Sequence, residues 1–302
     1  MQQFLSMLQL QLQLFTLMGI GYFLGKRKWM TPSGRSCLTN IFIQIILPCN
    51  IIMSFQAEFT GGILRQMVLL LLLSFAIQFF CLFLSKILYR KTEQRKRVVL
   101  QYATICSNSG FMGNPVVEGI YGAQGLLYAS IALIPVRIFM WSAGLSLFTV
   151  TTGRKVIRQI LTHPCILAVE LGLLLMFGRP ELPVFLEKTL SGLGSCVTPL
   201  SMLIIGSILA EVKWTDLFNR SLLFYTLIRL VLIPAAVLGV LRFLQCEPML
   251  TGVLTLLAGM PAGSTTAILA EKYGGDAAFA SQCVFVSTIA SVVTLSGFCL
   301  LL

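Results

Sequence analysis

Two short polar segments interrupt hydrophobic stretches of this chain, and both contain residues that break helices. The first, SNSGFMGNP, runs from Ser107 to Pro115, and the second, GMPAGSTT, runs from Gly259 to Thr266. A lipid-exposed helix does not tolerate such sequence, because the freed backbone groups would have no partner in hydrocarbon. Paired interruptions in matching parts of two halves are typical of the midplane binding site of a secondary transporter.

The chemistry that these segments favour is anion binding. Pro115 and Pro261 each fit the first turn of a half-helix, whose free amides and partial positive charge attract a carboxylate. The alternative is that both helices are only kinked and that the polar groups satisfy backbone. The side chains that could join the amides at a ligand are Asn108, Ser109, Asn114, Ser264 and Thr265.

Arg137 lies near the middle of a hydrophobic stretch, in the sequence ALIPVRIFMW. A charge at the bilayer centre costs at least about 2.5–3.5 kcal/mol on insertion scales, so something must offset this cost. A bound carboxylate held by both arms of the guanidinium would do so. Backbone carbonyls exposed by the interrupted helices are the structural alternative.

The other charged residues within hydrophobic stretches are few. Arg229 lies nearer the inner third of its stretch, where it could snorkel or pair with an acid. Of the eleven acidic residues only Glu170 lies deep within a span, as a proton-linked group or as the partner of a buried arginine. The acids near the interruptions that a cation exchanger would need are not evident, which favours an anion as cargo.

A second group of polar residues could face the cargo from another helix. Asn40, Gln44 and a position between 47 and 51, with Asn50 as the candidate, fall on one helical face. Ser201 lies at the corresponding place in the second half. Packing contacts between helices explain these residues equally well.

Composition indicates an all-α integral membrane protein. The 302 residues are 57% hydrophobic and 11% charged, against about 25% charged in soluble domains. The first stretch has no basic residues before its apolar core, so we interpret it as a transmembrane helix rather than a signal peptide. Ten spans are predicted: 5–25, 38–56, 66–89, 98–119, 125–150, 162–178, 190–210, 220–243, 249–271 and 277–301.

The net charge of +11 is explained by basic residues in the loops on one side of the membrane. We do not expect nucleic-acid binding. Besides Arg137 and Arg229 within spans, four of the 22 basic residues (Arg65, Arg179, Lys188 and Arg242) fall in loops on one side, and the other sixteen on the opposite side. The positive-inside rule then predicts a multi-pass protein of the cytoplasmic membrane with both termini outside.

Enzymatic and cofactor chemistry is not indicated. The nine cysteines form no C-x-x-C pair, His163 is the only histidine, and the phosphate-binding pattern G-x-x-x-x-G-K-[ST] is missing. We therefore predict neither a metal site nor a cofactor, and no enzyme activity.

Five spans in each half imply that residues 1–150 and 151–302 form two repeats of opposite orientation. Pro48 in span two lies 67 residues before Pro115, and Pro199 in span seven lies 62 residues before Pro261. In the order and spacing of these prolines, the two interruptions and the ten spans, the chain resembles the auxin efflux carrier family, in its bacterial malate- and malonate-type branch. The short connection from Thr151 to Leu161 lacks the long loop of the plant carriers, so auxin itself is not the expected cargo.

The resemblance implies a five-plus-five inverted repeat in which the broken spans four and nine cross. It implies a scaffold from spans 1, 2, 6 and 7, a transport core from spans 3–5 and 8–10, an organic-anion cargo and a possible homodimer. Two alternatives remain open. One is a sodium-coupled carrier of bile-acid-like anions, and the other is a non-transporting membrane sensor or channel.

Overall fold

The computed structural model describes residues 2–55, 63–148, 158, 162, 164–178, 182–210, 219–263 and 265–302. Across these residues the chain is helical, and no strand forms beyond one isolated bridge between Ser107 and Ala262. The helices of the first half are α1 (Gln2–Lys26), α2 (Pro32–Ile41), η1 (Phe42–Ile46), α3 (Leu47–Ser54), α4 (Ile63–Leu88), α5 (Gln94–Ile105), η2 (Ser109–Gly113), α6 (Asn114–Phe139) and η3 (Met140–Gly144).

The second half is built in the same way from long helices and pairs of shorter ones. The η elements in both halves are single π-helical turns that continue neighbouring α-helices. The helices are α8 (Pro164–Gly178), α9 (Val184–Gly194), α10 (Val197–Leu209), α11 (Arg220–Leu227), η5 (Ile228–Leu232), α12 (Ile233–Phe243), α13 (Pro248–Ala258), α14 (Thr265–Lys272) and α15 (Ala277–Leu301).

Each hydrophobic segment predicted from the sequence contains helix, and six of the described helical stretches are long and apolar enough to cross a membrane. The second and seventh segments begin earlier than predicted, at Pro32 and Val184. The first turn of α2 is polar, so hydropathy does not reveal it. Local capping starts α2 instead, because the Thr31 hydroxyl accepts a hydrogen bond from the amide of Gly34 at 3.1 Å.

Gly122 separates two helical runs within α6. Its φ of +64° lies in the left-handed region that only glycine adopts without strain, and the chain changes direction there. The predicted boundary between spans four and five falls at this residue. The predicted end of span five, at residue 150, lies outside the described residues.

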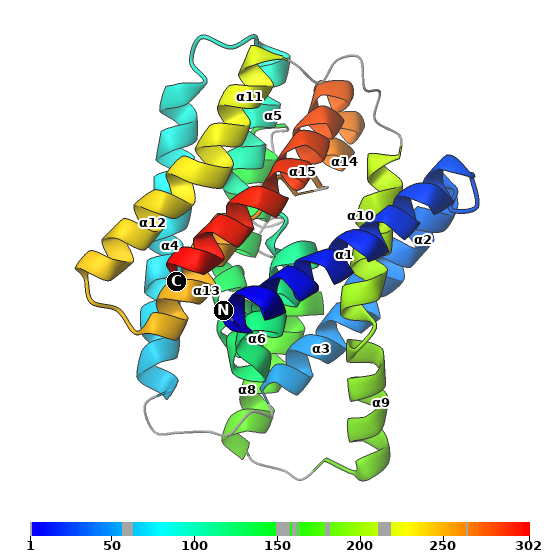
Figure 1. Cartoon of the computed structure of the whole chain (residues 1–302), viewed down its shortest axis with the longest axis vertical. Helices are drawn as coiled ribbons and strands as arrows, with labels where there is room; N and C mark the ends of the chain where they lie inside the picture. The colour runs from blue at the N-terminus through cyan, green and yellow to red at the C-terminus, as the bar shows by residue number, and fades with distance from the viewer. Residues whose placement is uncertain are drawn as a thin grey trace.

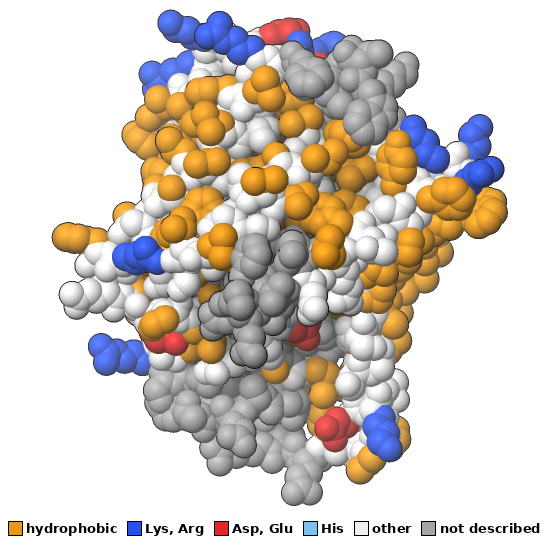
Figure 2. All heavy atoms as spheres, in the orientation of Figure 1, with side chains coloured by type: hydrophobic (Ala, Val, Ile, Leu, Met, Phe, Trp, Pro, Cys, Tyr) orange, Lys and Arg blue, Asp and Glu red, His pale blue; other side chains and the backbone are white. Residues whose placement is uncertain are grey.

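The helices pack in two groups (Figure 1). In one group α1 crosses α10, and α3 contacts α8 and α9. In the other, α4 packs on α5 and α6, α13 on α6 and α12, and α15 on α11 and α14. Figure 2 shows Lys and Arg side chains gathered at the top and the upper right, near the α4–α5 and α1–α2 turns, with hydrophobic side chains over much of the surface between them.

Glycines allow α1 and α10 to cross closely. A Cβ atom at Gly21 would lie 2.3 Å from the backbone oxygen of Leu203, and one at Gly206 would lie 2.0 Å from that of Met18. Small residues at such crossings let helix backbones approach, which is how helices associate in lipid. The α1–α10 contact therefore depends on glycine at both positions.

We expect Gly21→Ala to destabilise the protein by about 1–3 kcal/mol, because the added methyl group forces the two backbones apart. Gly19→Ala on the same helix is the matched control, since a Cβ there meets nothing within 4 Å. Thermal unfolding of the purified protein in detergent measures both. Equal melting temperatures for the two variants would contradict the close crossing.

Candidate functional site

The two polar interruptions meet in the structure. Residues 106–108 between α5 and η2 run antiparallel to residues 259–263 after α13. The amide of Asn108 donates to the carbonyl of Pro261 at 2.8 Å, and the amide of Gly263 donates to the carbonyl of Cys106 at 3.3 Å. Each unwound segment thus supplies backbone partners that the other lost when its helix ended.

Arg229 binds carbonyl groups at the end of α5 and in the second interruption. Its Nε donates to the carbonyl of Met260 and one terminal nitrogen donates to the carbonyl of Thr104, each at 3.0 Å. The side chain is only 3% exposed. The expectation that Arg229 would snorkel or pair with an acid is therefore wrong. Its place in the hydrophobic stretch could not reveal that helix ends from two other elements lie opposite it.

Hydroxyl groups satisfy further backbone groups at the crossing. Tyr225 donates to the carbonyl of Ala103 and Ser109 donates to that of Leu257, both at 3.2 Å. The hydroxyl of Ser287 accepts from the amide of Ala262 at 3.1 Å. Thr265 accepts a long hydrogen bond of 3.4 Å from Tyr102. Ser109 thus has the backbone-satisfying role that was the alternative to ligand binding.

The sequence suggested that the half-helices begin at the two prolines, and the structure shows that they do not. Helical structure in the first segment begins at Ser109 with a π-helical turn, and the amides of Gly113 and Asn114 donate to the carbonyls of Asn108 and Ser109. These amides are consequently not free for a ligand. In the second segment Pro261 lies in the extended part and α14 begins at Thr265. Ser264 lies outside the described residues.

Two asparagines of the first segment are buried with unpaired groups. Asn108 is 3% exposed and its Nδ2 has no hydrogen-bond partner among the described residues. Asn114 is fully buried, and neither its Nδ2 nor its Oδ1 has a partner there. Pro115 and Pro261 are buried beside them. Buried polar atoms without protein partners are costly, so these asparagines are candidates for contact with water, an ion or cargo.

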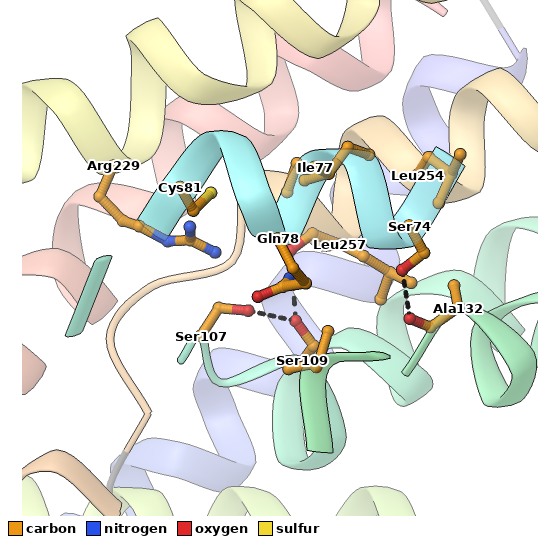
Figure 3. Close-up of a pocket in the computed structure, with 12 residues that line it drawn as sticks. Ser74, Ile77, Gln78, Cys81, Ser107, Ser109, Ala132, Arg229, Leu254 and Leu257 are labelled. Carbon is orange, nitrogen blue, oxygen red and sulfur yellow. Dashed lines mark hydrogen bonds between the residues drawn. The ribbon is translucent and has the colours of Figure 1, made fainter. Parts of the chain in front are cut away.

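A small polar cavity lies beside the crossing (Figure 3). The side chain of Gln78 on α4 points toward Ser107 and Ser109 across it, and Arg229 lines it from the side, whereas Ser74 donates to the carbonyl of Ala132 at 2.5 Å. Its volume of about 20 Å³ accommodates one water molecule, which needs about 10–15 Å³, but not a dicarboxylate. The cavity at the crossing is therefore not the place where an organic anion fits in this conformation.

Arg137 lies outside that cavity, although its neighbour Val136 lines it. The guanidinium group of Arg137 interacts with the thiol of Cys165 on α8. The side chain is 6% exposed, and its NH1 has no hydrogen-bond partner among the described residues. The two buried arginines thus differ, because Arg229 binds two carbonyl groups and Arg137 retains an unused donor.

The polar residues of the second predicted span do not share one face. Asn40 and Gln44 are exposed, whereas Asn50 is 6% exposed. The π-helical turn η1, which contains Gln44, separates Asn40 from Asn50 and adds a residue to the usual turn, which rotates α3 relative to α2. Ser201 is buried and donates to the carbonyl of Thr198 at 3.0 Å, a contact within its own helix.

Comparison with known proteins identifies the family. A family model described as "Membrane transport protein" matches residues 6–153 and 148–299, which together span nearly the whole chain. The chain belongs to this family. The family resemblance inferred from the sequence is thereby confirmed, and the protein is a transporter rather than an enzyme.

Relatives of similar length support the assignment. An uncharacterized transporter of Methanothermobacter thermautotrophicus is 26% identical over 301 residues, covering 97% of each chain. The uncharacterized transporter YfdV of Escherichia coli K12 is 22% identical, over 94% of this chain and 93% of its own. The likeness extends along both halves, so it covers the site described above.

The structure changes the view of the acidic residues of this transporter. Glu170 is exposed, and no described Lys or Arg pairs with it, so the expected pair with a buried arginine is wrong. Glu118, which sequence reasoning passed over because it lies near a predicted span end, is only partly exposed and accepts a hydrogen bond from Asn50. Its spacing of four residues from Asn114 was the available signal.

No three His, Cys, Asp or Glu side chains of the described part of the transporter gather closely enough to hold a metal ion. Glu118 instead accepts a hydrogen bond from the side-chain amide of Asn50 and lies on the same helix face as that of Asn114. A carboxylate among carboxamide groups can bind a proton or a cation of low charge, which is a different chemistry from that of a transition-metal centre.

We expect Arg229→Gln to lower the free energy of unfolding by several kcal/mol, because a buried carbonyl that loses its donor costs about 1–3 kcal/mol and two are affected. Arg229→Lys should fall between this variant and the wild type, since one ammonium group cannot reproduce the two-pronged contact. Thermal unfolding in detergent measures the loss, with the exposed Arg220→Gln of the same hydrophobic stretch as control. Unchanged stability in Arg229→Gln would contradict the structural role.

Proposed function

We propose that this transporter is a secondary carrier that moves a small organic anion, such as malate or malonate, across the cytoplasmic membrane. The observation that carries the proposal is the buried guanidinium group of Arg137, whose NH1 lacks a partner among the described residues. A carboxylate of the cargo is the counter-charge that such a group requires. The two-pronged contact of guanidinium with carboxylate would also orient the cargo.

Electrostatics support an anion rather than a cation at this place. A buried charge is stable only when it is paired or well hydrogen-bonded, and the thiol of Cys165 is a weak partner for a cation. No described Asp or Glu forms an ion pair with Arg137. The charge therefore remains available to a bound carboxylate, whereas the charge of Arg229 is engaged by backbone.

The packing of the helices supports alternating access as the mechanism. Arg137 lies on α6, in the group of helices formed by α4–α6 and α11–α15, and Cys165 lies on α8, in the group formed by α1–α3 and α8–α10. We assign these groups as transport core and scaffold. Cargo bound between them would become accessible to either side as the core moves, and the ten-span inverted repeat supplies two related conformations.

The small volume at the crossing fits this scheme. Asn108, Asn114, Pro115, Pro261 and Thr265 would shape the core beside the cargo, and Asn50 would face them from the scaffold. The crossing itself would serve as a rigid centre that moves with the core. A homodimer formed through the scaffold is compatible with such movement.

We expect malate counterflow into proteoliposomes loaded with unlabelled carboxylates, and we expect Arg137→Gln to reduce it by at least about tenfold, because loss of a charged hydrogen bond costs about 1.5–3 kcal/mol. Arg137→Lys should retain part of the activity, since it keeps the charge without the fork. Arg65→Gln, at an exposed arginine of α4, is the matched control.

Several outcomes would refute the proposal. Unchanged counterflow in Arg137→Gln would remove the substrate role of this residue. Failure of every carboxylate in a folded wild-type protein would exclude the anion assignment. Unsaturable flux with measurable conductance would indicate a channel, and transport of bile-acid-like anions in place of malate would favour that alternative carrier.

The proposed orientation makes a separate prediction about topology. With both termini outside, alkaline phosphatase fused after Leu302 should be active in a bacterial host, and green fluorescent protein at the same place should be dark. Fusions in the α4–α5 turn, near Lys91, should behave in the opposite way. Reversal of both patterns would show that the basic loops lie outside.

A further inference from the structure

Three polar residues from two helices lie at the end of the first interruption and one turn beyond it. Asn114 and Glu118 lie four residues apart in the helical run of α6 before Gly122, so they share one face of that helix. Asn50 on α3 donates a hydrogen bond to the carboxylate of Glu118. Because α3 contacts α6 directly, this face of α6 is turned toward α3.

This group contains two unpartnered carboxamide oxygens, and the Nδ2 of Asn114 is its one unpartnered donor. Asn50 is 6% exposed and Asn114 is fully buried, and the Oδ1 atoms of both have no hydrogen-bond partner among the described residues. No described Lys or Arg forms an ion pair with Glu118. Two buried carboxamide oxygens without partners and a carboxylate without a counter-charge therefore lie on the facing sides of α3 and α6.

We propose that Asn50, Asn114 and Glu118 form a binding site for a sodium ion. Oxygen atoms of carboxylates and amides are the ligands that hard cations take. The single carboxylate neutralises one positive charge, which suits a monovalent cation better than Ca²⁺ or Mg²⁺ in a largely buried place. Among alkali cations, the smaller sodium ion needs the fewer oxygen ligands.

The relation between the two halves of the chain does not explain why Glu118 is present. The reciprocal hydrogen bonds of the crossing equate Asn108 with Gly263 and Cys106 with Pro261, an offset of 155 residues, and the residue 155 positions after Glu118 is Tyr273. The second half thus carries a neutral residue where the first carries Glu118. A structural requirement of the crossing would apply to both halves, so the carboxylate has a purpose that only the first half supplies.

The site would couple the ion to movement. Asn50 belongs to the helices assigned above as scaffold, and Asn114 and Glu118 belong to the core. This consequence rests on the proposed function, because it requires core and scaffold to move against each other. Sodium would then favour the conformation in which α3 and α6 lie together, since only that conformation assembles all three ligands.

Direct binding tests the site without any assumption about cargo. The melting temperature of the purified full-length protein is measured while NaCl replaces choline chloride at constant ionic strength. We expect a saturable rise with sodium, and we expect Glu118→Gln and Asn50→Ala to weaken the apparent sodium affinity by at least about tenfold. Glu170→Gln, at the exposed acid of α8, should titrate as the wild type does.

A second variant and a second cation make the result decisive. Glu118→Asp keeps the charge but shortens the reach, so it should bind sodium more weakly than the wild type and more tightly than Glu118→Gln. If Glu118→Gln does not fold, the Glu118→Asp titration and binding of radioactive sodium to the wild type decide the question. The proposal is overturned if sodium has no effect beyond choline, if potassium reproduces the curve at the same concentrations, or if Glu118→Gln retains the wild-type affinity.

Failure of this site and failure of the anion assignment are distinguishable. Sodium binding that depends on Glu118, in a protein that moves no carboxylate, would leave the site in place and refute the cargo. Malate counterflow without any sodium-specific stabilisation would support the cargo and refute the site.

Discussion

The structure depends on the pairing of two helix interruptions with each other. Each interrupted helix leaves backbone groups that lipid cannot satisfy, and the amides of Asn108 and Gly263 resolve part of this by crossing to carbonyls of the opposite segment. Arg229 resolves another part, because one guanidinium group binds a carbonyl at the end of α5 and a carbonyl in the second segment. Two breaks that would each be too costly alone therefore become stable when they meet, and they position polar residues deep within an apolar protein.

Satisfying this backbone has consequences for the chemistry of the site. The groups that look most reactive in the sequence, such as the hydroxyl of Ser109 and the guanidinium of Arg229, are occupied by carbonyl groups. The groups that remain unsatisfied include the NH1 of Arg137, toward α8, and the Oδ1 atoms of Asn50 and Asn114, between α3 and α6 where Glu118 has no counter-charge. Both places lie between the two groups of helices, where relative movement would expose or bury them.

The two places carry opposite charges, so the ligands that they bind can compensate each other's charge. An unpaired guanidinium attracts an anion, and an unpaired carboxylate attracts a cation, so joint occupation would neutralise both buried charges. A carrier that loads both ligands moves less net charge through the low dielectric than one that loads the anion alone. The rigid crossing between the two places would keep their separation constant during movement, because its hydrogen bonds lie within one group of helices.

The sequence by itself determined the membrane class, the family, the hydrophobic segments and the two interruptions, because each depends on local composition and on residues that break helices.

Only the tertiary structure decided what the charged residues contact. Arg137 and Arg229 look alike in hydropathy, yet one meets a thiol on α8 and the other meets two helix ends. The π-helical turns at η1 and η2 rotated Asn50 away from Gln44 and satisfied the amides near Pro115, which a 3.6-residue period could not foresee. Glu118 became a candidate only when α3 was placed beside it, since burial and partners are properties of packing.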